Sequence, residues 1–135
     1  FTFGFFSKVL NGIWVGGLPT NGNVSEMSVQ YNEYLGKYVV LYTDGANDVV
    51  MRVSASPQGE WSDTTTLVSN NQTTNTGMYA PMVHPMSGTD YFNVTNADGS
   101  VEDNSRYLYY NLSYWGAYNV RLMRTNLEPM TTIEV

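Results

Sequence analysis

A strand pattern that occurs twice constrains the fold of this chain more than any other feature. Residues 37–43 and 48–53 are apolar, β-branched runs that flank the polar turn 44–47. A weaker copy follows about 70 residues later, at 107–110 and 119–124. Runs of this composition around a turn of Asp, Gly and Asn are typical of antiparallel hairpins. The pattern therefore predicts an all-β fold built from a repeated sheet unit.

The first copy is expected to contain four strands. Residues 27–32 alternate between apolar and polar side chains, which predicts a strand with one buried face. Gly36 is part of the turn that joins this run to 37–43. After the third strand, a turn that contains Pro57, Gly59 and Trp61 leads into the Thr-rich run 64–68, the expected outermost strand.

The second copy is expected to begin at 79–85, where Pro81 and Pro85 should bracket a short strand at a sheet edge. Proline cannot donate a hydrogen bond to a sheet ladder, so it favours edges and strand ends. We expect the apolar run to continue through 91–94 and a surface insertion to follow at 96–104.

The end of the second copy should be a hairpin over 106–124 that turns near Trp115. Residues 129–135 are then expected to form a closing strand. No segment has the composition of an α-helix of any length.

Composition limits the possible functions. The net charge is −6 and the six basic residues are scattered, so the sequence provides no phosphate-binding surface and argues against nucleic acid as a partner. A neutral polysaccharide is compatible with this charge. The chain has no cysteine, which excludes disulfides and cysteine-based metal sites. No apolar run approaches the roughly 18–20 residues of a membrane span.

Four segments together resemble the later blades of five-bladed β-propeller glycoside hydrolases, the arabinanase, xylosidase and fructosidase superfamily. The four segments are residues 26–32, residues 36–43, the Ser56-Pro57-x-Gly59-x-Trp61-Ser62 turn, and residues 79–85. Within that superfamily the segments are most similar to secreted propellers long known only as an uncharacterised domain. Some members of this group cleave D-arabinofuranosyl linkages of cell-wall arabinan.

The resemblance implies a β-propeller of antiparallel four-stranded blades, of which this chain covers about two and a half. Residues 1–19 would be the end of a preceding blade, 20–70 one blade, and 71–135 the next blade with its closing strand. So few blades cannot close a ring. The remaining blades are therefore expected from the rest of a larger protein or from another chain.

The resemblance also implies a function and a location. It indicates the C-terminal part of a glycoside hydrolase that acts on furanoside-rich, arabinan-type polysaccharide and is secreted or associated with the cell envelope. Such enzymes use paired carboxyl groups, one of which protonates the leaving oxygen. The blades that usually carry the first acids are not expected here, so the catalytic set should be incomplete. The alternative is a non-catalytic propeller that binds carbohydrate or serves in cell-envelope assembly.

Glu26 is the candidate catalytic residue, because the resemblance places a general acid at the start of an inner strand. A solvated strand-end carboxylate is the alternative. The candidate substrate-binding residues are Tyr31, Asn32, Tyr79, His84 and Trp115. Aromatic rings stack on sugars, and an indole at a hairpin tip is a plausible platform. Packing within the sheets is the alternative for the tyrosines, and a hydrogen-bonded structural role is the alternative for His84.

No metal site and no cofactor are predicted. His84 is the only histidine, and no cysteine accompanies it. A structural calcium is conceivable at Asp98, Glu102 and Asp103, but these residues lack the spacing of a calcium-binding loop.

Overall fold

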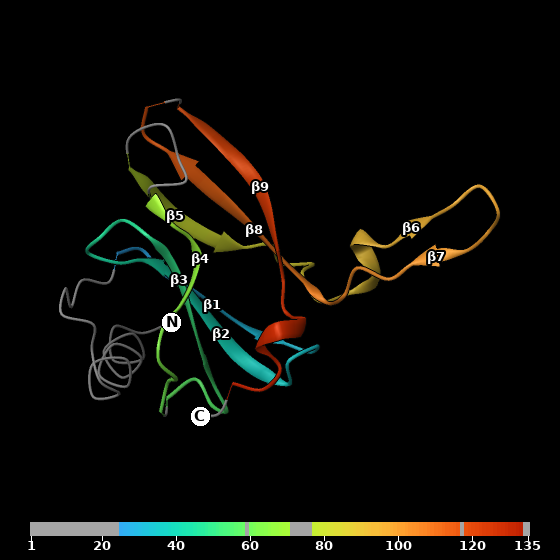
Figure 1. The fold of residues 1–135 in the computed structure, drawn as a ribbon, viewed down its shortest axis with the longest axis horizontal. Helices are drawn as coiled ribbons and strands as arrows, with labels where there is room; N and C mark the ends of the chain where they lie inside the picture. The colour runs from blue at the N-terminus through green and yellow to red at the C-terminus, as the bar shows by residue number, and fades with distance from the viewer. Residues whose placement is uncertain (1–24, 59, 71–76, 117, 134–135) are drawn as a thin grey trace.

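The computed structural model describes residues 25–58, 60–70, 77–116 and 118–133. Within these ranges the protein is all-β, with antiparallel sheets and no α-helix (Figure 1). This confirms the all-β, antiparallel part of the predicted fold class. The preceding blade expected at 1–19 lies outside the described residues.

The first sheet is a four-stranded antiparallel meander in the order β1-β2-β3-β4. Its strands are β1 (Ser28–Asn32), β2 (Lys37–Thr43), β3 (Val49–Ser54) and β4 (Thr65–Val68). The alternation and turn residues dictate this register, which pairs Val39 with Val53 and Leu41 with Met51. The four-stranded unit expected from the sequence is thus confirmed, and its shape is that of a propeller blade.

The second sheet repeats the first but has three strands, in the order β5-β8-β9. They are β5 (Met78–Val83), β8 (Tyr107–Tyr114) and β9 (Asn119–Asn126). The hairpin of β8 and β9 turns at Trp115, as predicted. These two sheets do not by themselves close a ring.

Pro81 lies inside β5 rather than at its end, so the predicted bracketing of the strand is wrong at this residue. The strand accommodates it because the register with β8 shifts between Tyr79 and Met82. Ala80, within the shift, has a φ of 49°. Because β5 is an edge strand, the N–H that Pro81 lacks would have had no partner strand to pair with. The prediction of an edge position is confirmed.

The run 91–94 is not one strand. Asp90–Phe92 forms a 3-10 turn, η2, which is capped by the Thr89 side chain accepting the Tyr91 N–H. The short strands β6 (Val94–Thr95) and β7 (Val101–Glu102) then form a separate hairpin. This hairpin is the predicted surface insertion, and it projects away from both sheets (Figure 1).

The closing strand expected over 129–135 is also wrong for the described residues. The chain forms a 3-10 turn, η3, at Glu128–Met130, and a further turn follows. Leu127 is fully buried and anchors this reversal, because its N–H donates to the Arg106 carbonyl at 2.9 Å. Residues 134–135 lie outside the described part of the chain.

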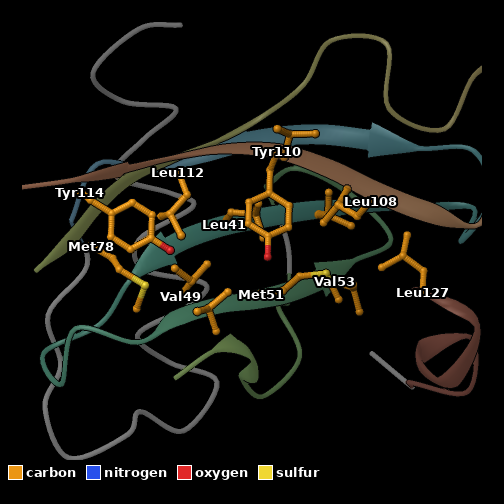
Figure 2. Packing of buried hydrophobic residues seen from close by; sticks show 13 residues of the cluster. Leu41, Val49, Met51, Val53, Met78, Leu108, Tyr110, Leu112, Tyr114 and Leu127 are labelled. Carbon is orange, nitrogen blue, oxygen red and sulfur yellow. The ribbon is translucent and has the colours of Figure 1, made fainter. Parts of the chain in front are cut away.

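The hydrophobic core lies between the two sheets (Figure 2). Leu41, Met51 and Val53 project from the first sheet toward Leu108 and Leu112 of the second, and all five are buried. The opposite face of the first sheet carries a smaller apolar cluster around Trp61. Within the described ranges, no helix is long and apolar enough to cross a membrane.

Candidate functional site

The inner strands β1 and β5 run side by side in the same direction (Figure 1). The Val83 N–H donates to Ser28 Oγ at 3.0 Å, and Gln30 Nε2 donates to the Pro85 carbonyl at 3.4 Å. Each bond joins residues 55 positions apart. Ser28 is the first residue of β1 and Val83 the last of β5, so the two strands are staggered and β1 begins level with the end of β5.

Two of the predicted site residues, Tyr79 and Trp115, lie where β5 begins. The Trp115 backbone N–H donates to the Gly77 carbonyl at 3.2 Å, directly before β5. Glu26 is exposed and precedes β1.

An aromatic platform is the most developed feature where β5 begins. The rings of Tyr79 and Trp115 stack with centroids 4.5 Å apart and planes 27° apart. Trp115 is 57% exposed, so the stack presents a large indole surface to solvent. Gly77 makes this arrangement possible, since a Cβ there would lie 2.9 Å from Trp115 Cδ1. Its φ of +39° also favours glycine.

The other three predicted residues follow or end a strand: Tyr31 and Asn32 are the last residues of β1, and His84 comes directly after β5. Asn32 is 2% exposed, and its Oδ1 accepts the Leu35 N–H at 2.9 Å, which stabilises the β1–β2 turn. Tyr31 is half exposed and packs edge-on against Tyr38 at 5.1 Å.

His84 is held by the turn that directly follows β5. Its Nδ1 accepts the Met86 N–H at 3.1 Å, which leaves Nε2 to carry the proton of the neutral ring. The ring contacts Phe92 edge-on at 5.0 Å and lies 6.0 Å from Tyr91. Phe92 in turn stacks on Tyr109 at 3.8 Å.

The six predicted residues therefore do not form one site. From Glu26 to Asn32 the extended chain advances about 20 Å at roughly 3.3 Å per residue. The structure stacks Tyr79 on Trp115, holds Asn32 in the β1–β2 turn and holds His84 in the turn after β5.

Comparison with known protein families identifies the chain's relatives. A family model described as "Domain of unknown function (DUF4185)" matches residues 13–124. The chain belongs to this family. DUF4185 is a β-propeller family, which agrees with the two blade-like sheets. No curated protein matches the chain.

The sequence analysis missed one notable residue of this DUF4185 chain. Arg52 is completely buried in β3, on the face that also carries Tyr42. Its Nε donates to Tyr42 Oη at 2.9 Å and its Nη1 to the Ser62 carbonyl at 3.0 Å, while Nη2 has no partner within the described ranges. The available signal was the apolar face on which Arg52 lies, which carries Val50 in β3 and Val40 in β2.

Acidic residues of the DUF4185 chain serve turns. Asp98 accepts hydrogen bonds from the Ser100 side chain and N–H, and these bonds lower the pKa of Asp98. The bond from the Ser105 N–H lowers the pKa of Asp103 in the same way. In the described part of the chain, no group of three or more histidine, aspartate or glutamate side chains is arranged to hold a metal ion.

Proposed function

We propose that this chain is part of an exported DUF4185 propeller that binds furanoside-rich, arabinan-type polysaccharide where the inner strand β5 begins. The whole protein is a glycoside hydrolase in this proposal, and this chain contributes its aromatic platform. The stacked pair of Tyr79 and Trp115 is the observation that carries it. An exposed indole backed by a second ring offers a flat apolar surface to the C–H face of a sugar.

Charge and position support the choice of ligand. A net charge of −6 disfavours anionic polymers, whereas a neutral arabinan meets no such repulsion. Glu26 is exposed and directly precedes the inner strand β1, and in this proposal its carboxyl group approaches the bound sugar. A glycosidase needs a second carboxyl group across the scissile bond. In this proposal the rest of the propeller supplies it.

Binding is tested by calorimetric titration of the chain with soluble arabinan. Trp115→Ala should weaken binding about tenfold, since a lost aromatic contact is worth up to roughly 1.5 kcal/mol. The matched control is Tyr118→Ala, which removes an 89% exposed aromatic from the same turn. Equal affinities for the two variants, or no binding by the unsubstituted chain, would contradict the proposal.

The catalytic part needs its own test, made on the protein that carries all the blades. Release of reducing ends from arabinan should fall at least 100-fold in Glu26→Gln, the magnitude typical of a lost general acid. Binding of arabinan should persist in the same variant. If cleavage is unchanged while Trp115→Ala abolishes binding, the chain is a carbohydrate-binding segment without a catalytic residue at Glu26.

A further inference from the structure

The first sheet has a second buried face, opposite the core that it shares with the second sheet. This face carries Arg52 beside Val40 and Val50, and Trp61 belongs to the same apolar cluster. Arg52 is 0% exposed and Trp61 is 3% exposed. In a ring of blades each sheet packs against one neighbour on either face. Because the second sheet covers the core side, the Arg52 face is the side of the preceding blade.

Two buried donors on this face have no acceptor within the described ranges. One is Nη2 of Arg52 and the other is Nε1 of Trp61. The other guanidinium nitrogens donate to neutral groups, Nε to Tyr42 Oη at 2.9 Å and Nη1 to the Ser62 carbonyl at 3.0 Å. Neutral acceptors do not balance the positive charge, and a buried charge without a counter-charge is costly. The face therefore requires an anionic acceptor.

The acidic residues of this chain do not provide that acceptor in the part of the chain that the structure describes. All twelve acidic residues except Glu134 lie there, and none of those described forms an ion pair with Arg52. Residues 1–24 and 71–76 contain no Asp or Glu. Ile133, directly before Glu134, packs against the core on the other face of the sheet. A carboxylate for Arg52 is therefore expected from another blade.

We propose that a carboxylate of the preceding blade pairs with Nη2 of Arg52 and joins the two blades. This inference rests on the proposal that the chain is part of a larger propeller. Arginine suits the contact, because its planar guanidinium binds two acceptors of its own sheet and keeps the Nη2 donors for the neighbouring blade. The two bonds within the sheet also hold the guanidinium in place, so little side-chain entropy is lost when the pair forms. Such a pair fixes the register of one blade on the next.

Urea unfolding of the protein that carries all the blades tests the pair. Each Asp and Glu of the preceding blade is changed to its amide, once with Arg52 present and once in the Arg52→Met background. One amide substitution should lower the unfolding midpoint by at least about 1 M with Arg52 present, because it leaves the buried cation unpaired. In the Arg52→Met background the same substitution should leave the midpoint unchanged or raise it, since the carboxylate has no partner there. Glu128→Gln, the same change at an exposed residue of this chain, should have no effect in either background.

A second measurement applies if Arg52→Met does not fold. In nitrogen NMR spectra of the arginine side chains, the Nη protons of Arg52 should exchange slowly in the unsubstituted protein and rapidly in the amide variant. Three results would overturn the proposal: no amide substitution whose effect depends on Arg52, dependence on Glu134 of this chain instead, or a midpoint raised by chloride at constant ionic strength. Arabinan binding, measured on the same variants, should be unchanged. A failed pairing with intact arabinan binding would therefore overturn this inference alone.

Discussion

The contact between the buried Arg52 and Tyr42 gives a sharp prediction about stability. Tyr42→Phe removes the acceptor of Arg52 Nε and leaves that N–H unpaired in the interior, beside the Nη2 that already lacks a partner in the described ranges. Hydrogen bonds to charged groups are worth about 1.5–3 kcal/mol. We expect Tyr42→Phe to lower the free energy of unfolding by about 2 kcal/mol.

In the Arg52→Met background the same change should cost much less than 1 kcal/mol, because the donor is gone. Arg52→Met alone combines two lost hydrogen bonds with the removal of a buried cation, and these effects oppose each other. A double-mutant cycle cancels them and isolates a coupling of about 2 kcal/mol. With an m-value of about 2 kcal/mol per molar urea, Tyr42→Phe shifts the unfolding midpoint by about 1 M in one background only. Equal shifts in both backgrounds would refute the reasoning.

Two further predictions concern the platform and the response to alkali. Gly77→Ala should displace the Trp115 ring and weaken arabinan binding several-fold. The control Gly99→Ala, at a φ of +84° with open space around it, should leave arabinan binding unchanged. Equal effects of the two substitutions would show that backbone strain alone is responsible. Burial raises the pKa of Tyr110 above its ordinary value of 10.0, and this effect is larger than the opposite effect of its hydrogen bond with Thr125. The neutral phenol therefore contributes its full stability below about pH 10, and this stability is lost as the pH rises through the folded-state pKa. Tyr110→Phe should therefore reduce the fall in unfolding free energy above about pH 10, measured by urea denaturation, and an unchanged slope would contradict this.

The hairpins of the fold were predictable because local chemistry specifies them. Asp44 Oδ1 accepts the N–H groups of Ala46 and Asp48, so the β2–β3 turn is encoded within five residues. The offset of 70 residues then carries β2 onto β8 and β3 onto β9. The strand positions repeat at that distance, whereas the turn residues differ: Asp44-Gly45-Ala46-Asn47 corresponds to Tyr114-Trp115-Gly116-Ala117.

The errors lie where long-range packing decides the structure. Pro129 disfavours a strand in the segment 129–133, and burial of Leu127 under the second sheet redirects the chain into η3. Pro81 is accommodated by a register shift within an edge strand, and a shift of this kind depends on the partner strand. The buried position of Arg52 likewise depends on Tyr42 and Ser62 being brought to it by the sheet.

The predicted site residues are separated because of a difference in residue spacing between strands, and this difference can be interpreted only once the fold is known. Neighbouring inner strands are offset by 55 residues, whereas β2 and β8 are offset by 70. The additional residues enter after β5, and they form η2 and the β6–β7 hairpin. There Phe92 and Tyr91 pack against His84 and occupy the space beside it, whereas Trp115, in the turn between β8 and β9, is 57% exposed.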